Sequence, residues 1–234
     1  MDEHCSCRVI GPGTYPPGDP DGSKSRAKFE QDGGCGQFAK DKEQKKPEDT
    51  GCYVGLDLSL TSSGWATLRG GKIEVGTIKT TPKTCENDLA RLRYICDKIM
   101  AKIPADVKMV AAEDFYAPRG PSAGSAISLA MLAAVIRTAM YEKGIKFIII
   151  APVQNKLYCT GSGKSEKNLM LLSCFKRWNL TLANDDEGDA VALCYLAHAI
   201  DIYPECDPDE TKPMREVVKR IIKERPKYNF KKEA

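Results

Sequence analysis

Val54-Gly55-Leu56-Asp57-Leu58-Ser59 places one acidic residue inside a short apolar run, and this stretch decides how the fold is interpreted. Apolar runs of this length are typical of a strand that is buried on both faces. Two further apolar runs, 64–69 and 72–78, are joined by Gly70-Gly71, a pair that is typical of a tight hairpin turn. The sequence therefore predicts three hairpin-linked strands, with a carboxylate at the end of the first.

Helices and strands alternate after this hairpin. Further strands are predicted over 108–115 and 146–151, because both are short segments with an apolar run at their centre. Apolar residues at helical spacing predict helices over 86–103, 125–143, 165–178, 186–202 and 213–225. The element order predicts an α/β fold and resembles that of ribonuclease H-like domains, in which helices flank a mixed five-stranded sheet.

Composition places the chain among globular proteins that bury a core. The 234 residues are 42% hydrophobic and 29% charged, and the longest apolar run, 128–136, is shorter than the ~20 residues that span a bilayer. No apolar segment follows a basic start, so neither a membrane span nor a secretory signal is expected. The ten cysteines are scattered, several of them in apolar stretches, which favours reduced thiols and a cytoplasmic location, with a nucleus or organelle left open.

Three regions are predicted along the chain. Residues 1–50 contain seven Gly and five Pro without apolar periodicity, which predicts a disordered tail. Residues 51–205 are expected to form the folded domain. Residues 206–234 are predicted to be a basic helical extension, either a polyanion-binding segment or a solvated helix, because 212–234 hold nine basic and three acidic residues. In the tail, zinc binding by His4, Cys5, Cys7 and Cys35 is an alternative to disorder, although their spacing matches no standard zinc motif.

Four acidic residues lie where solvated charge is not expected: Asp57, Glu113, Asp186 and Asp189. The last two are three residues apart on a predicted helix and therefore share a face. Crowded carboxylates raise one another's pKa unless a cation neutralises them, and oxygen ligands suit Mg²⁺ or Mn²⁺. Two such ions would suit in-line hydrolysis of a phosphodiester.

The residues around these acids form recognisable motifs. Segments 54–59, Ala112-Glu113-Asp114-Phe115-Tyr116 and Asp186-Glu187-Gly188-Asp189-Ala190 resemble the three acidic motifs of the RuvC family of Holliday-junction resolvases. Lys156 and Lys167, eleven residues apart around the Gly/Ser-rich segment 160–166, resemble the two active-site lysines of that family. The resemblance covers roughly residues 52–203, and the flanking segments indicate a divergent member, such as a phage or other viral protein.

The resemblance implies a homodimeric endonuclease that requires Mg²⁺, with Mn²⁺ as a substitute, and nicks two strands of a four-way DNA junction. It implies that the four carboxylates bind metal and that Lys156 and Lys167 lie near the scissile phosphate. The DNA-binding residues expected from it are Tyr116, Arg119, Ser162 and Lys164. For Tyr116, insertion into the junction centre and ordinary packing both remain open.

Two other functions are compatible with the same fold. A ribonuclease H-type nuclease on RNA–DNA hybrids would use the same metal chemistry, and a non-catalytic binder of branched nucleic acid would be expected to lack one of the carboxylates. A dimer is expected to form through the helix 125–143, unless that helix is simply central to the core. The helix carries Ile127, Leu129, Leu132, Val135, Ile136 and Met140.

Overall fold

A computed structural model describes residues 51–115, 123–205 and 210–224, without the side chains of 123–125 and Lys167. The chain divides into two units, Met1–Glu48 and Asp49–Ala234, and every described residue belongs to the second. The predicted N-terminal tail, with the four residues considered as zinc ligands, therefore lies outside the described residues.

A five-stranded mixed sheet lies at the centre of the described unit, with the strand order β3-β2-β1-β4-β5. Its strands are β1 (Cys52–Asp57), β2 (Ser62–Arg69), β3 (Lys72–Lys79), β4 (Val107–Glu113) and β5 (Phe147–Ile150). The first three pair antiparallel, and the predicted turn between β2 and β3 holds two glycines with positive φ, Gly70 and Gly71. β4 joins β1 in parallel, and β5 joins β4 in the same way.

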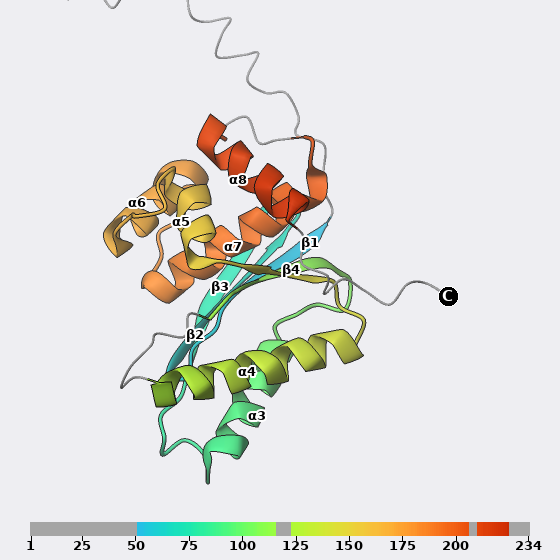
Figure 1. The fold of residues 1–234 in the computed structure, drawn as a ribbon, viewed down its shortest axis with the longest axis vertical. Coiled ribbons are helices and arrows are strands. Elements are labelled where there is room, and N and C mark those ends of the chain that lie inside the picture. The colour runs from blue at the N-terminus through green and yellow to red at the C-terminus, as the bar shows by residue number, and fades with distance from the viewer. Residues whose placement is uncertain (1–50, 116–122, 206–209, 225–234) are drawn as a thin grey trace, which may run out of the picture. The chain divides into compact units, whose positions relative to one another are not determined.

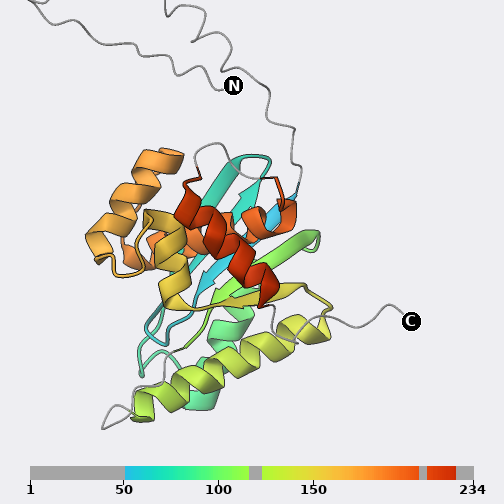
Figure 2. The same cartoon turned by 45° about the horizontal axis from the view of Figure 1, so that its top comes forward.

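Helices cover both faces of the sheet, as Figures 1 and 2 show. One face carries α3 (Asp88–Met100) and α4 (Ala123–Glu142). The other carries α5 (Pro152–Thr160), α6 (Lys167–Trp178), α7 (Asp185–Ile202) and α8 (Lys212–Lys223). The predicted α/β class, a ribonuclease H-like sheet flanked by helices, is confirmed.

The central strands are buried on both sides, which explains why the β1 sequence is continuously apolar. Tyr53 points into the core beneath α5–α8, whereas Val54 and Leu56 point into the core beneath α3 and α4. The same alternation occurs in β4, where Ala111 belongs to the first core and Ala112 to the second.

α7 lies directly on β1 and β2 because two glycines leave room for it. A Cβ atom added to Gly55 would lie 2.0 Å from the backbone oxygen of Ala190, and one added to Gly64 would lie 2.1 Å from that of Asp186. Both contacts are with backbone atoms, so neither would be relieved by a change of rotamer. This close approach brings the first turns of α7 to the end of the sheet at which β1 stops.

α5 was not expected, because the sequence pattern predicts no helix between 151 and 165. The helix is only nine residues long, and its fully buried residues are Asn155, Tyr158 and Cys159. Its boundaries were nevertheless visible, with Pro152 in the first turn and Gly161, at φ 81°, directly after the last turn.

α4 is apolar on two sides. Leu132, Ile136 and Met140 are fully buried against the sheet, so these three residues of the expected dimer face belong to the core. Its exposed large side chains include Ile127, Met131 and Val135, which are spaced four residues apart and therefore lie on one face. Among the helices that the structure describes, none is both long and apolar enough to cross a membrane.

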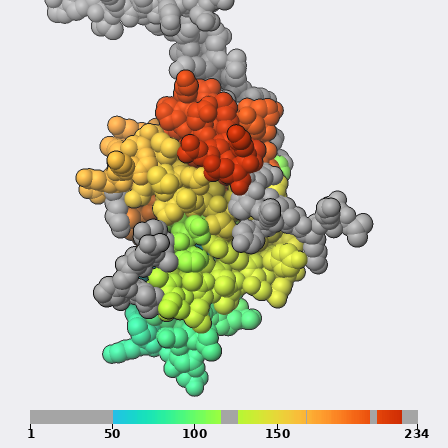
Figure 3. Space-filling view, viewed as in Figure 1, coloured from blue at the N-terminus to red at the C-terminus, as the bar shows by residue number. Residues whose placement is uncertain are grey.

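α8 packs against α5 and α7 and contributes to the core rather than standing apart from the domain. Its buried residues are Met214, Val217, Val218 and Ile221. Its basic residues, among them Lys212 and Lys223, are exposed, and Figure 3 shows α8 at the surface of the molecule on the same face as α4.

Candidate active site

Two of the four predicted carboxylates lie at the ends of adjacent parallel strands. Leu56 of β1 is in register with Ala112 of β4, so the residues that follow them, Asp57 and Glu113, are neighbours at the same edge of the sheet. Their carboxyl groups lie close enough for each to shift the pKa of the other. The parallel pairing of β1 and β4 therefore brings together residues that are 56 positions apart in the sequence.

The other two carboxylates, Asp186 and Asp189, belong to α7, which packs on β1 and β2. The side chain of Asn184 caps this helix by accepting a hydrogen bond from the Glu187 N–H at 3.0 Å. Asp186 and Asp189 thus lie in the first two turns, where the positive end of the helix dipole favours negative charge. The Ser62 hydroxyl donates to Oδ2 of Asp186 at 2.5 Å, which ties the start of β2 to the helix.

The electrostatics of this cluster are unfavourable in the absence of a cation. Burial raises the pKa of Asp57 well above its usual range, and the charges of Glu113, Asp189 and Asp186 raise it further. Burial and the charge of Asp189 likewise raise the pKa of Glu113. When no cation is bound, the raised pKa values of these neighbouring groups favour a proton held by the pair.

A cation from α5 faces this cluster. The charge of Lys156 lowers the pKa of Glu113, opposing the larger effects of burial and Asp189. The preceding residue, Asn155, is fully buried and donates from Nδ2 to the backbone oxygen of Asp189 at 3.3 Å. This contact holds α5 against α7, so Lys156 approaches the carboxylates from a fixed helix.

The remaining predicted residues are placed less completely. Ser162 and Lys164 are exposed in the segment between α5 and α6, and Lys167 begins α6, although its side chain is not described. Tyr116 and Arg119 lie outside the described residues. The structure therefore brings together the four carboxylates and Lys156, and leaves the placement of the other lysine and of the two residues after β4 untested.

The donor set at this edge suits a hard divalent cation. All four predicted ligands are carboxylates, and the raised pKa values of Asp57 and Glu113 indicate crowded negative charge that a bound cation would offset. In the described ranges, no group of three or more His, Cys, Asp or Glu side chains is already arranged to hold an ion. Binding would therefore require side-chain adjustment, and the residue types fit Mg²⁺ or Mn²⁺.

Several residues that shape this site were not found from the sequence. Ser62 and Asn155 form hydrogen bonds with the two turns of α7 that carry Asp186 and Asp189. Gly55 and Gly64 allow that helix to pack closely against β1 and β2. A glycine inside a strand often marks a close contact with another backbone, and this signal was available in the sequence for both glycines.

Comparison with known proteins gives one consistent match. A family model described as crossover junction endodeoxyribonuclease RuvC matches residues 53–198. Among curated proteins, the chain is similar to a crossover junction endodeoxyribonuclease RuvC from Bifidobacterium adolescentis, with 28% identity over 160 residues that cover 63% of this chain and 78% of that protein. A protein of the same name from Rickettsia felis is 24% identical over 155 residues, covering 63% of this chain and 97% of its own.

Solved structures agree on the fold. Thermus thermophilus RuvC aligns with a TM-score of 0.50 alone and 0.52 in a complex with a Holliday junction substrate. Each alignment has 19% sequence identity and covers 61% of this chain and 90% of the other. The family-model match ends at residue 198, before α8, which begins at Lys212.

Proposed function

Because the chain belongs to the RuvC family of crossover junction endodeoxyribonucleases, we propose that it cuts four-way DNA junctions by Mg²⁺-dependent hydrolysis of phosphodiester bonds. The observation that carries this proposal is the convergence of Asp57 and Glu113 with the carboxylate-bearing turns of α7 at one edge of the sheet. The junction complex of the T. thermophilus protein supports branched DNA as the substrate.

Four carboxylates would hold the metal: Asp57, Glu113, Asp186 and Asp189. Bound Mg²⁺ would supply activation of the attacking water and stabilisation of the leaving oxygen. Ser62 keeps one oxygen of Asp186 engaged, which orients the other oxygen of that carboxylate. Partial burial of Asp57 and Glu113 limits the water around them and strengthens every charge interaction at the site.

The lysines would act on the phosphate. Lys156 faces Glu113 from α5, and a fixed cation there would stabilise the negative charge that develops on the phosphate oxygens during hydrolysis. We assign the same role to Lys167. Further contacts with DNA are assigned to Ser162 and Lys164, which are exposed beside these lysines, and to Tyr116 and Arg119, which follow β4.

We further propose that the chain acts as a homodimer through α4. Two symmetrical incisions in one junction require two active sites related by a two-fold axis, and such an interface uses the same surface of both subunits. The exposed apolar face of α4 formed by Ile127, Met131 and Val135 would meet its counterpart there, while the opposite face of the helix remains in the core.

Incubation of the purified chain with labelled substrates tests this function. Four-way junction, linear duplex and RNA–DNA hybrid of related sequence would each be tested with and without Mg²⁺. We expect only the junction to be cut, and only with the metal. Efficient cutting of the hybrid alone would instead support the ribonuclease H-type alternative.

One substitution and a matched control test the site. Asp189→Asn should abolish cleavage and leave junction binding within about twofold, because affinity comes mainly from contacts between cations and phosphates. Asp185→Asn makes the same change in the same helix, outside the predicted ligand set, and should retain cleavage. Near wild-type cleavage by Asp189→Asn would refute the ligand assignment, and binding without cleavage by the unsubstituted chain would favour the non-catalytic alternative.

A further inference from the structure

Glu210 is a buried acidic residue that lies outside the carboxylate cluster, just before α8. Only 4% of it is exposed. Its Oε1 accepts a hydrogen bond at 2.9 Å from the hydroxyl of Tyr158, which belongs to α5 and is 2% exposed. A hydrogen bond between two buried side chains is costly to break, because the group that remains loses its partner without gaining water. The bond therefore links the segment that precedes α8 to α5.

A second side chain holds the same half of α5 from α6. Nη1 of Arg177 donates to the backbone oxygens of Tyr158 and Cys159, at 2.8 and 3.3 Å. Its guanidinium lies 4.9 Å from the centre of the Tyr158 ring. A cation beside the last carbonyl groups of a helix complements the negative end of the helix dipole. The C-terminal half of α5 is therefore held both by α6 and by the segment that precedes α8.

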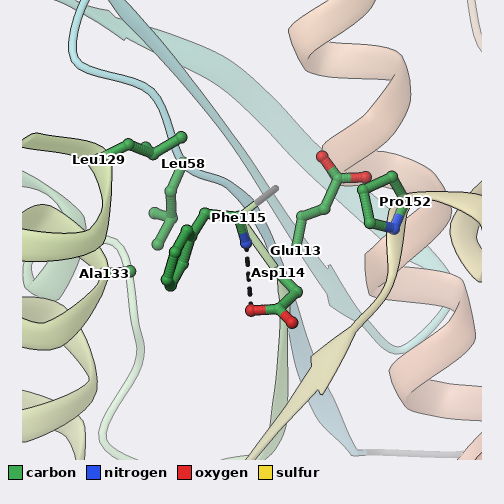
Figure 4. Close-up of a pocket in the computed structure, with 7 residues that line it drawn as sticks. All are labelled: Leu58, Glu113, Asp114, Phe115, Leu129, Ala133 and Pro152. Carbon is green, nitrogen blue, oxygen red and sulfur yellow. Dashed lines mark hydrogen bonds between the residues drawn. The ribbon is translucent and has the colours of Figure 1, made fainter. Parts of the chain in front are cut away.

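α5 begins beside the proposed active site. Its first residue, Pro152, lines the same cavity as Glu113, and Figure 4 shows both residues on one side of that cavity. Lys156 follows one turn later, and its charge lowers the pKa of Glu113. Lys156 and Tyr158 are two residues apart, so on a helix their side chains point in directions that differ by about 200°. Glu210 thus contacts α5 on the side away from Lys156.

The orientation of α5 depends on such contacts, because the helix is only nine residues long. Isolated helices shorter than about 12–15 residues are marginally stable in water. One buried polar side chain, Asn155, ties α5 to the backbone of Asp189 on α7, and another, Tyr158, ties it to Glu210. A displacement of a catalytic group by about 1 Å can slow a reaction about 100-fold. Loss of either contact would therefore affect any reaction that uses Lys156.

We propose that Glu210 is a positioning residue for phosphodiester hydrolysis: through Tyr158 it fixes α5 and so holds Lys156 where it can act on the scissile phosphate. This inference rests on the proposed junction cleavage and on the role that it assigns to Lys156. The family-model match ends at residue 198. The support for the lysine thus comes from a part of the chain that the family model does not cover.

Single-turnover cleavage of a four-way junction by the full chain in Mg²⁺ tests this role, at a temperature where circular dichroism shows each variant folded. Glu210→Ala should lower the rate constant of cleavage about 10- to 100-fold, as expected for a displacement of about 1 Å. The junction Kd should stay within about twofold, because affinity is spread over many phosphate contacts. Glu210→Gln keeps an oxygen that can accept from Tyr158 and should restore the rate. If Glu210→Ala does not fold, Tyr158→Phe removes the same hydrogen bond and keeps the ring.

A matched control and a double-mutant cycle separate positioning from general stability. Glu216→Ala removes an exposed carboxylate of α8 that pairs with Lys219, and it should cleave at the unsubstituted rate. Lys156→Ala removes the side chain that Glu210 is proposed to place. In that background Glu210→Ala should slow cleavage by less than about twofold, because residues that act as a unit are non-additive. A purely structural defect would lower the rate by the same factor in both backgrounds.

The outcomes distinguish this inference from the proposed function. If the unsubstituted chain cuts no junction, the proposed function fails. If it cuts junctions but Glu210→Ala and Tyr158→Phe cut equally fast, the positioning role is wrong while junction cleavage stands. The same conclusion follows if Glu210→Ala slows both backgrounds by one factor, if Glu210→Gln is as slow as Glu210→Ala, or if Lys156→Ala retains the full rate.

Discussion

Replacement of Asp57 by Asn should stabilise the metal-free protein at neutral pH, although it removes a residue of the proposed active site. The folded state holds the Asp57 proton more tightly than the unfolded chain does, because burial and three nearby carboxylates raise its pKa. For an acid shifted in this direction, stability is greatest at low pH and falls as the pH rises through the raised pKa. Asparagine has no charge to bury and can hydrogen bond to Glu113.

The expected gain follows from the size of the shift. One pKa unit corresponds to about 1.4 kcal/mol, and buried carboxyl groups shift by up to about 3–5 units. A shift of only two units that is fully expressed at pH 8 would make the substitution stabilising by about 3 kcal/mol. For a folded unit of this size, that free energy corresponds to an increase in Tm of about 6–12 °C.

Urea denaturation of both proteins, followed by circular dichroism, measures this difference. At about pH 4, near the ordinary pKa of Asp, the gain should fall below about 1 kcal/mol, because the group is protonated in the folded state and already about half protonated in the unfolded chain. Excess Mg²⁺ should stabilise the unsubstituted protein more than the variant, since an ion that binds only the folded state raises its stability.

A matched control separates this effect from a general loss of surface charge. Asp106→Asn removes an exposed carboxylate whose pKa is lowered by its hydrogen bonds to Arg69. This variant should be no more stable than the unsubstituted protein and should keep the full response to Mg²⁺. If Asp57→Asn were destabilising at pH 8, or equally stabilising at pH 4 and pH 8, the electrostatic account of the carboxylate cluster would be refuted.

Three further predictions concern the rest of the molecule. Gly55→Ala should destabilise the fold by at least about 3 kcal/mol in urea denaturation, since its Cβ would meet the backbone of Ala190 on α7. Met131→Asp should convert a particle of about twice 25.7 kDa to the single-chain mass in light scattering, and an unchanged mass would place the dimer interface elsewhere. Joint replacement of Lys212 and Lys223 by Gln should weaken junction binding and reduce its salt dependence. Both side chains are exposed, so Tm should not change, whereas deletion of α8 would also remove part of the core.

Much of the fold was predictable because it depends on local patterns. The apolar run of β1, the glycine pair before β3 and the helical spacing in α3 each indicate one element within a short window, and their order indicates the α/β class. The four carboxylates were conspicuous for a related reason, since acids at the ends of apolar strands and on the apolar helix α7 conflict with local hydrophobic patterning.

The exceptions have physical causes. α5 was missed because a nine-residue helix with few buried positions has little periodicity, although Pro152 and Gly161 mark its ends. The face of α4 that is buried was not determined by its sequence, since the helix is apolar on both sides. Packing on the sheet buries Leu132 and Ile136 and leaves Met131 exposed.

The sequence alone determined which residue types are available for chemistry, namely oxygen ligands and lysines, and on which elements they lie. Only the tertiary structure decided that they meet. Asp57 and Glu113 become neighbours through the parallel register of β1 and β4, and Ser62 reaches Asp186 across 124 positions of sequence. Such contacts depend on how closely whole elements approach one another. Here a glycine at the centre of β1 lets α7 rest on the sheet, and no local pattern of hydrophobicity encodes that distance.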